Sequence, residues 1–299
     1  MTTTPAKHNS KKPPWLKVPF PGGNRYSWIK DLSSRLNLNT VCEEANCPNI
    51  GECWNGGTAT FMLMGDTCTR GCRFCAVKSA KYPNALDTNE PFKLADTIKK
   101  MNLNYVVLTT VNRDDLKDQG ASHIARCIKA TQKTSPNLLI EILMPDFRGD
   151  EEALQKVIDA TPSVLAHNLE TVRRLTPKVR DYRADYDQSL EVLRYLKTNC
   201  PNGYTKSSLM LGLGESHREI LKAMEDLRDA GVDFLTFGQY LQPTRKHLKV
   251  VKFLDPDEFK ELKHIGEKMG FDFVASGPLV RSSYKAAEFY IERKIRGTI

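Results

Sequence analysis

Six short apolar segments with β-strand character alternate with longer helical patterns along most of this sequence. The strand-like segments span residues 58–64, 104–110, 138–144, 163–168, 207–212 and 233–239. The helical patterns span residues 91–101, 121–134, 150–160, 187–199 and 215–230. Strands joined by helices predict a parallel sheet with right-handed crossovers. A closed barrel of this type needs eight strand–helix units. Six units therefore predict an α/β fold with a partial (β/α)6 TIM-like barrel, and a flat doubly wound sheet is the alternative.

Two extensions flank this repeat and divide the 299 residues into three predicted parts. Residues 1–56 begin with an arm rich in Lys, Pro and Thr and end in a segment that holds three cysteines. Residues 57–254 form the predicted barrel. Residues 255–299 form the C-terminal extension, in which two helical patterns flank a short apolar strand, at residues 255–270, 284–295 and 271–276.

The charge of the chain is concentrated at its two ends. The sequence has 44 Lys and Arg residues against 36 Asp and Glu residues, a formal net charge of +8. Residues 1–30 hold six basic residues and no acidic one, and residues 281–299 hold five basic and two acidic residues. Such termini are either solvated tails or a docking surface for an acidic partner. No RNA-binding motif accompanies them, so nucleic acid is not predicted as a partner.

Six of the eight cysteines lie between residues 42 and 75. A disulfide scaffold does not fit, because the chain is long enough to bury a core and its first 14 residues lack the apolar segment of an export signal. No apolar run approaches the ~18 residues of a membrane span. Clustered thiols in a reducing compartment instead indicate metal or iron–sulfur ligation. We therefore expect a cytoplasmic protein with no membrane partner.

Cys68, Cys72 and Cys75 form a C-x3-C-x2-C motif directly after the first predicted strand. In barrels of this kind, the loops at the carboxyl ends of the strands form the active site. Three thiolates can bind three irons of a [4Fe–4S] cluster and leave the fourth iron open for a substrate or cofactor. A structural zinc site is the alternative, but zinc motifs usually combine two closely spaced pairs of ligands. The motif, with Phe74 before its last cysteine, resembles that of the radical S-adenosylmethionine (SAM) superfamily.

Cys42, Cys47 and Cys53 form a second motif, C-x4-C-x5-C, that precedes the first predicted strand. A second iron–sulfur cluster is the physical interpretation. Together with several other blocks, this motif resembles the lipoyl synthase family. The matching blocks lie at residues 12–17, 40–53, 57–62, 65–75, 111–115, 167–171 and 277–284. None of them departs from the family's pattern.

The resemblance implies an activity and its cofactors. In this family, two sulfur atoms are inserted at C6 and C8 of an octanoyl chain that is attached to a lysine of a carrier protein. The resemblance implies two [4Fe–4S] clusters, and two SAM molecules used per lipoyl group. The cluster on the second cysteine triplet cleaves SAM to give the radical that removes hydrogen. The auxiliary cluster on the first triplet is consumed as the sulfur source, while the protein supplies placement and exclusion of water.

The resemblance also implies partners. These are octanoylated lipoyl carrier domains, from the E2 subunit of a 2-oxoacid dehydrogenase or the H protein of glycine cleavage, and an electron donor such as flavodoxin or ferredoxin. The basic termini would then help to steer an acidic carrier. One alternative is another two-cluster radical SAM sulfur-inserting enzyme, such as a tRNA methylthiotransferase, although the sequence shows no RNA-binding appendage. A zinc protein that binds nucleic acid is the other.

Ser283 is the expected fourth ligand of the auxiliary cluster. The resemblance implies this role for the second serine of the segment Arg281-Ser-Ser-Tyr284. From the residues alone, Ser282 or Ser283 would cap a helix that begins near Tyr284. A serine oxygen is a harder ligand than a thiolate and suits iron–sulfur chemistry less well. Such a weak ligand is what a cluster that is consumed would need.

Polar residues after the predicted strands are the expected SAM contacts. Asn112 follows the second strand, and Asn168 and Glu170 follow the fourth. We expect Asn112 to meet the SAM amino group and Asn168 and Glu170 to bind ribose hydroxyls. Arg183 is the expected partner of the SAM carboxylate, and Phe74 belongs to the cysteine loop that borders SAM. For each residue, a solvated loop or a helix cap is the alternative.

Overall fold

The computed structural model of the protein describes residues 12–18, 20–36, 38–44, 47, 49–55, 60–283 and 291–297. Cys42 lies in a short described helix, but its side chain lies outside the described residues. The prediction that Cys42 ligates a cluster therefore stays a prediction.

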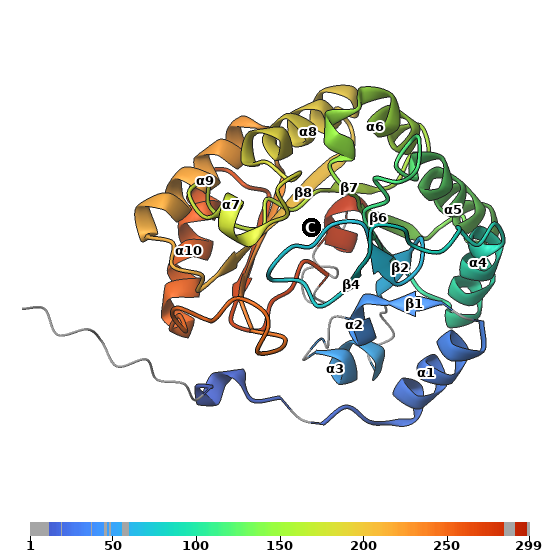
Figure 1. The fold of residues 1–299 in the computed structure, drawn as a ribbon, viewed down its shortest axis with the longest axis horizontal. Coiled ribbons are helices and arrows are strands. Elements are labelled where there is room, and N and C mark those ends of the chain that lie inside the picture. The colour runs from blue at the N-terminus through green and yellow to red at the C-terminus, as the bar shows by residue number, and fades with distance from the viewer. Residues whose placement is uncertain are drawn as a thin grey trace, which may run out of the picture.

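A curved eight-stranded sheet forms the centre of the fold (Figure 1). Seven strands are parallel, in the order β2, β5, β6, β7, β8, β9, β10, and β1 pairs antiparallel with β2 at one edge. Their bounds are β1 (Asn39–Thr40), β2 (Thr60–Leu63), β5 (Tyr105–Thr110), β6 (Leu139–Leu143), β7 (Val164–Ala166), β8 (Tyr204–Leu211), β9 (Phe234–Gln239) and β10 (Phe273–Gly277). Among the described strands, β1 and β10 are the two edges, so the barrel is open.

The predicted partial barrel is confirmed. The six predicted strands coincide with β2 and β5 to β9, although β8 begins three residues earlier than expected. The helices lie on the outer, convex side of the curved sheet in Figure 1, so the flat doubly wound alternative is wrong. The predicted short strand at 271–276 is β10, and it extends the same sheet because Phe273 to Gly277 pair in parallel with Phe234 to Gly238 of β9.

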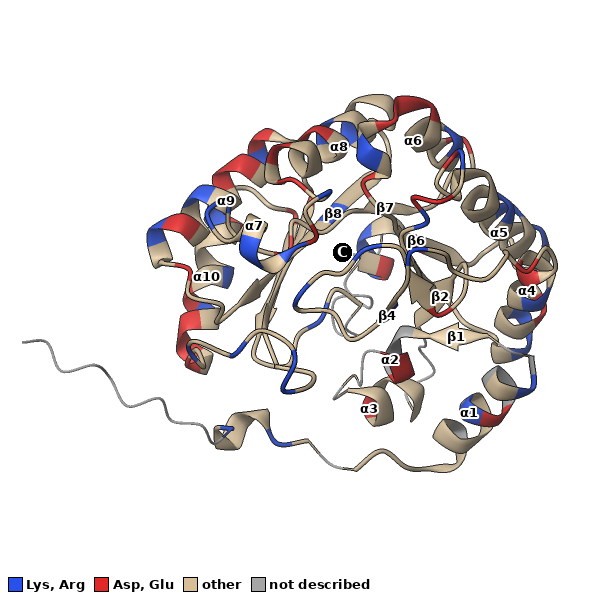
Figure 2. Cartoon of the chain, in the orientation of Figure 1, with Lys and Arg blue, Asp and Glu red and all other residues tan. Residues whose placement is uncertain are grey.

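Six long helices cover the outer side of the sheet. They are α4 (Glu90–Met101), α5 (Ala121–Thr134), α6 (Glu151–Ile158), α8 (Tyr186–Asn199), α9 (His217–Asp229) and α10 (Pro256–Lys268). Side chains fix where several begin: Asp150 caps α6, Asp185 caps α8, and Ser216 with Glu219 forms a capping box on α9. Each such cap stabilises a helix by about 1 kcal/mol. Charged residues of both signs lie along the outer helices (Figure 2), as expected of solvated faces.

The remaining elements are α1 and several short ones, which surround the open side and the loop that carries Cys68, Cys72 and Cys75. They are η1 (Pro14–Leu16), α1 (Asn24–Leu36), α2 (Val41–Glu44), α3 (Ile50–Asn55), β3 (Thr67–Cys68), β4 (Lys78–Ser79), η2 (Phe147–Gly149) and α7 (Thr176–Val179). In Figure 1, α1, α2 and α3 lie beside β1, at the open side of the barrel. In the part of the chain that is described, no helix combines the length and apolar character that crossing a membrane requires.

Side chains fill the interior of the barrel. A helical turn at 291–295 supplies Ile291, which is fully buried against Val107, Val164 and Phe234 from three different strands. In the same part of the sheet, Lys206 of β8 donates to both oxygens of Glu141 of β6 at 2.8 Å. Both side chains are at most 2% exposed, so each depends on the other for its charge to be tolerated. The barrel interior is therefore a packed floor beneath the loops.

Candidate active site

The cysteine motif lies in the loop that follows β2, at the carboxyl end of the barrel. Backbone N–H groups from two other loops point at its sulfur atoms. The N–H of Asn112, after β5, lies 3.3 Å from Cys68 Sγ, and the N–H of Asp181 lies 3.3 Å from Cys72 Sγ. Once a bound metal has deprotonated the thiols, these N–H groups can donate hydrogen bonds to the thiolates.

The donor set fits an iron–sulfur cluster. Cys68, Cys72 and Cys75 are free thiols that line one cavity of about 190 Å³. Burial raises the pKa of Cys72 to about 11 and that of Cys75 to about 12. Thiolates with such pKa values need a bound metal to persist at neutral pH, because metal coordination deprotonates a thiol. Three soft ligands in this arrangement suit iron–sulfur ligation.

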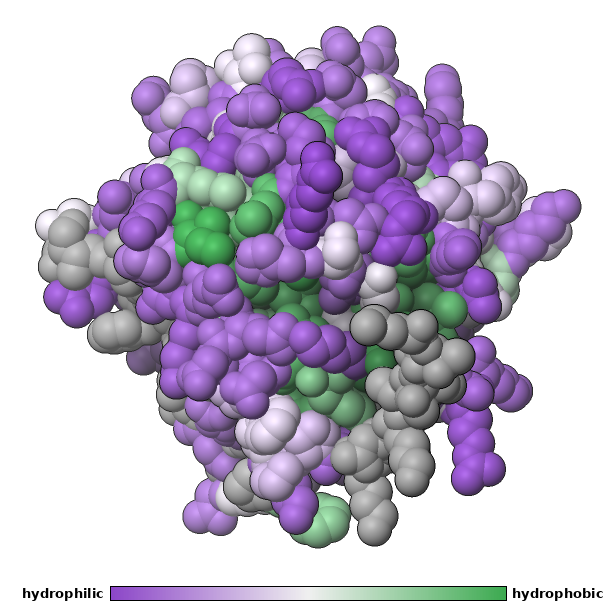
Figure 3. All heavy atoms as spheres, turned by 90° about the vertical axis from the view of Figure 1, so that its left-hand side faces the viewer, coloured by the Kyte–Doolittle hydropathy of each residue, from purple (hydrophilic) through white to green (hydrophobic). Residues whose placement is uncertain are grey.

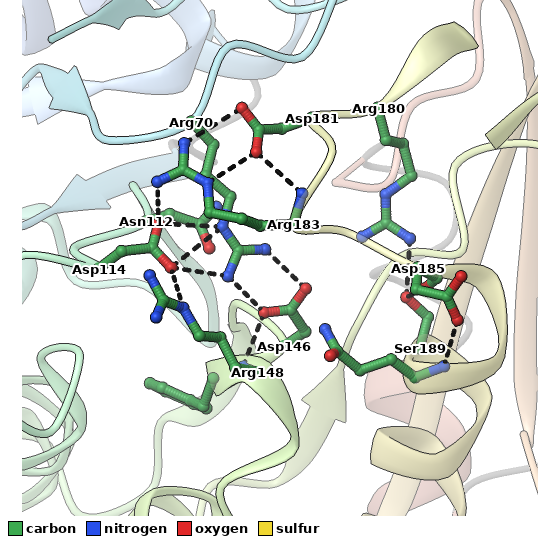
Figure 4. A network of polar contacts seen from close by, with 12 residues as sticks. Arg70, Asn112, Asp114, Asp146, Arg148, Arg180, Asp181, Arg183, Asp185 and Ser189 are labelled. Carbon is green, nitrogen blue, oxygen red and sulfur yellow. Dashed lines mark hydrogen bonds and ion pairs between the residues drawn. The ribbon is translucent and has the colours of Figure 1, made fainter. Parts of the chain in front are cut away.

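A buried arginine anchors the cysteine loop to the barrel. Arg70, between Cys68 and Cys72, is 3% exposed and forms paired contacts with two aspartates (Figure 4). Its Nη1 and Nη2 donate to the two oxygens of Asp146 at 2.6 and 2.7 Å, and its Nε and Nη2 donate to Asp114 at 3.0 and 2.9 Å. Burial opposes ionisation of Asp114, but the hydrogen bonds from Arg70 hold its pKa well below the usual range. Two bidentate contacts fix one guanidinium completely.

A second arginine braces the outside of the same loop. Arg183 donates from Nε to Asp181 at 2.8 Å and from Nη2 to the carbonyl of Thr69 at 2.7 Å. Asp181 in turn accepts from the N–H of Gly71 at 2.8 Å. Arg183 therefore contacts the outer side of the loop and does not line the cavity that the cysteines share.

Four of the five expected SAM residues do line that cavity: Phe74, Asn112, Asn168 and Glu170. Glu170 occupies a left-handed conformation with φ of 70° and is held there by two backbone hydrogen bonds to β8. Its carboxylate accepts from Asn168 Nδ2 at 3.2 Å, and burial raises its pKa. These side chains come from three different loops, which makes the cavity a composite site at one end of the barrel.

Arg180 also lines this cavity, and sequence reasoning missed it. Its Nη1 donates to Ser189 Oγ at 2.7 Å, which holds a buried cation at the wall of the cavity. His167 is a further missed residue. Burial lowers its pKa to about 4, so the ring is neutral at pH 7 and lies 3.1 Å from the same Ser189 Oγ. Only the matching block at 167–171 signalled His167.

A larger cavity, of about 420 Å³, adjoins the first and connects the two ends of the chain. We call it the chamber. Its lining includes Cys47, Cys53, Cys75 and Ser283. Ser282 is a lining residue as well. The chamber therefore brings cysteines from both motifs and the C-terminal serine to one cavity.

The side chain of Asn49 connects the two extensions at the chamber. Asn49 donates from Nδ2 to the carbonyl of Leu279 at 2.7 Å, although 230 residues separate them. Burial raises the pKa of Cys47, and the nearby Arg281 partly offsets this. Gly238 of β9 permits the close approach of the C-terminal segment, because a Cβ atom there would lie 2.1 Å from the carbonyl oxygen of Val280.

The chamber walls are largely apolar. The apolar and aromatic lining residues are Phe74, Val107, Leu143, Leu209, Met210, Tyr240, Leu241, Pro243 and Val280. Figure 3 shows the side of the molecule that lies on the left in Figure 1, where hydrophobic residues are recessed between hydrophilic ones. An apolar enclosure with a few polar groups suits a ligand that is mostly hydrocarbon.

Comparisons with known proteins agree with this geometry. Residues 62–238 match the radical SAM superfamily, and residues 2–47 match the N-terminal domain of lipoyl synthase of the radical SAM family. A mitochondrial lipoyl synthase from Branchiostoma floridae is 56% identical over 285 residues, which cover 94% of this chain and 76% of that protein.

A lipoyl synthase from Anaeromyxobacter sp. (strain Fw109-5) is 55% identical over 286 residues, which cover 96% of this chain and 97% of that protein. Among solved structures, the FeFe-hydrogenase maturase HydG from Carboxydothermus hydrogenoformans has a similar fold. The TM-score is 0.58 at 10% identity, with 83% of this chain and 56% of that chain covered.

Proposed function

The chain belongs to the lipoyl synthase family of the radical SAM superfamily, and from this premise we propose which of its residues perform each part of the reaction. It is a sulfur-inserting enzyme that acts on lipoyl carrier proteins. When bound, the [4Fe–4S] cluster and SAM supply a one-electron cleavage whose product removes hydrogen from an unactivated C–H bond. The single observation that carries the residue assignments is that Cys47 and Cys53 of the first cysteine motif, Cys75 of the second and Ser283 line one chamber.

Cys68, Cys72 and Cys75 hold the cluster that binds SAM. Phe74, Asn112, Asn168 and Glu170 complete the SAM site, because they line the same cavity as the three thiols. The carboxyl group of Glu170, next to Asn168, suits paired ribose hydroxyls, because its oxygens can accept the hydrogen bonds that these hydroxyls donate. The carboxylate of SAM needs a cation inside this cavity.

For that cation we propose Arg180 in place of the expected Arg183. Arg180 lines the cavity, whereas both guanidinium edges of Arg183 already bind Asp181 and Thr69. We expect Arg180→Gln to raise the dissociation constant of SAM by roughly 10- to 100-fold, the usual effect of losing a charge-assisted hydrogen bond. Equilibrium dialysis with reconstituted, anaerobic protein measures this constant. Arg183→Gln, compared at equal cluster content, should change the dissociation constant of SAM by less than about threefold. A larger effect of Arg183→Gln than of Arg180→Gln would restore Arg183 as the SAM contact.

Cys42, Cys47, Cys53 and Ser283 hold the auxiliary cluster, which donates sulfur. Support comes from the shared lining of the chamber by Cys47, Cys53 and Ser283, and from the hydrogen bond of Asn49 that joins the two extensions. We keep the division into residues 1–56, 57–254 and 255–299, since the outer two parts supply the auxiliary ligands. The chamber between the cysteine sets then takes the octanoyl chain, and inserting two sulfurs consumes two SAM molecules.

The partners follow from this chemistry. We propose that the carriers are lipoyl domains of E2 subunits or the H protein, and that flavodoxin or ferredoxin supplies the electrons. A reducing cytoplasm suits both the free thiols and the clusters.

One assay tests the proposed function directly. The protein is reconstituted anaerobically with iron and sulfide, then mixed with SAM, dithionite and a peptide that carries octanoyl-lysine. We expect mass spectrometry to show a peptide with two added sulfurs and two molecules of 5′-deoxyadenosine per product. Formation of 5′-deoxyadenosine with an unchanged peptide would refute the substrate. Absence of both products, with both clusters loaded, would refute the function.

A further inference from the structure

A hollow of about 500 Å³ lies on the outer face of the cysteine loop. Its walls include Thr69, Ala80, Tyr82, Tyr182 and Arg183. None of its lining residues also lines the SAM cavity or the chamber. A partner in this hollow would therefore not compete with an acyl chain that enters the chamber.

Two exposed tyrosines flank the hollow. Tyr182 is 87% exposed and Tyr82 is 78% exposed, which is unusual for side chains of this size. A cation lies over each ring: Arg183 is 5.0 Å from the Tyr182 ring centroid, and Lys81 Nζ is 5.1 Å from that of Tyr82. Tyrosine and arginine are enriched among the residues that dominate binding at protein interfaces. The composition of the hollow is thus that of a protein-docking surface.

The most exposed charges at the hollow are cations, and its two lining carboxylates, Asp114 and Asp115, are both paired with arginines. The side chain of Arg148 is 51% exposed and that of Arg183 is 23% exposed, whereas their shared partner Asp114 is 3% exposed. Figure 4 shows Asp114 between these arginines and Arg70, turned toward the loop. Lys81 has no carboxylate partner among the ion pairs of the described residues. A partner that approaches from solvent therefore meets positive charge, which favours an acidic protein.

The wall of the hollow is hydrogen-bonded to the backbone of a cluster ligand. The N–H of Ala80 donates to the carbonyl of Cys68 at 3.0 Å, and Arg183 donates to the carbonyl of Thr69 at 2.7 Å. One hydrogen bond and a few covalent bonds thus connect this surface with the sulfur of Cys68. A route of this kind is suited to electron transfer, because it leaves no gap through solvent.

We propose that this hollow is the docking site of an acidic one-electron donor protein. The reduced donor loses one electron, the cluster on the Cys68 loop gains it, and no atom or proton is transferred. The proposal rests on the reductive SAM cleavage given above. Because the hollow and the chamber have separate linings, the electron donor and the acyl carrier can be bound at the same time.

The test compares one protein donor with one chemical reductant, using reconstituted enzyme. The probe is flavodoxin, an acidic flavoprotein, and the variants are Lys81→Glu and Tyr182→Ala, which alter neither a cysteine nor the Arg70 contacts. We expect the dissociation constant of flavodoxin, measured by isothermal titration calorimetry, to rise by about tenfold or more in each variant. The wild-type affinity should fall with added salt, and that dependence should be weaker in Lys81→Glu.

The rate of 5′-deoxyadenosine formation separates this proposal from the proposed function. With reduced flavodoxin below saturation, we expect a loss of about tenfold in both variants, and with dithionite a change of less than about twofold. Lys246→Glu, which makes the same charge change on the exposed basic segment at 245–249, should match the wild type. Unchanged flavodoxin affinity in the hollow variants, or a loss in Lys246→Glu alone, would overturn the docking site. If wild-type protein forms no 5′-deoxyadenosine with dithionite, the result would instead contradict the proposed function.

Discussion

Replacing Arg70 by lysine should yield a folded protein that cannot keep its SAM-binding cluster. Lysine offers one point charge where the guanidinium makes two bidentate contacts, with Asp114 and Asp146. If the lysine stays with Asp114, the buried Asp146 would lose its guanidinium partner, a loss that typically costs about 3–5 kcal/mol. The loop that carries Cys68 and Cys72 would then no longer be held against the barrel. We expect iron binding at this site to weaken by roughly 10- to 100-fold, as for other residues that orient metal ligands.

Iron and sulfide analysis, together with the EPR signal of the reduced cluster, measures this effect. Circular dichroism establishes that the barrel is intact. Arg148→Lys is the matched control, since Arg148 also binds Asp114 but its side chain is 51% exposed, so its contact is partly screened by solvent. We expect its cluster content to stay within about twofold of the wild type. A full cluster in Arg70→Lys protein would show that the thiols alone position the iron.

Local patterns in the sequence predicted the elements of the fold well. Strands buried on both faces, such as β5 and β9, are rich in apolar residues, and several helices, including α6, α8 and α9, carry their own caps. The cysteine loop was also predictable, because its three cysteines lie within eight residues shortly after β2. The pairing of β10 with β9 was not predicted, since a short apolar strand contains no information about which neighbour it joins.

Contacts between distant segments decide the parts of the site that the sequence left open. Arg180 and Arg183 lie three residues apart in one loop, and no periodicity distinguishes them. The difference is made by Asp181, which binds Arg183 and the N–H of Gly71 and so turns Arg183 away from the SAM cavity. Likewise, Asn49 and Leu279 bring the extensions together through a contact across 230 residues. Because such contacts are not visible in the sequence, only the family resemblance pointed to Ser283 as a ligand.

Replacing Ser283 by alanine should separate the two halves of the reaction. The variant loses the oxygen that we assign to the auxiliary cluster but keeps every residue of the SAM cavity, which Ser283 does not line. We expect 5′-deoxyadenosine formation to continue, while the yield of peptide with two added sulfurs falls by roughly 100-fold, as expected for loss of an essential metal ligand. Mass spectrometry of the peptide gives the yield, and Mössbauer spectra give the state of the auxiliary cluster.

Ser282→Ala is the control, because Ser282 is the neighbouring hydroxyl that lines the same chamber. If only the removal of Ser283 alters the spectra, the oxygen acts as a ligand, since a helix cap would affect stability and leave the iron unchanged. If both variants keep wild-type spectra and full sulfur insertion, the serines serve the local fold, and the fourth iron takes its ligand from elsewhere. Equal loss in both would instead indicate that the C-terminal segment closes the chamber as a whole. A difference between these two adjacent hydroxyls therefore identifies a ligand, because a general weakening of the fold would affect both variants alike.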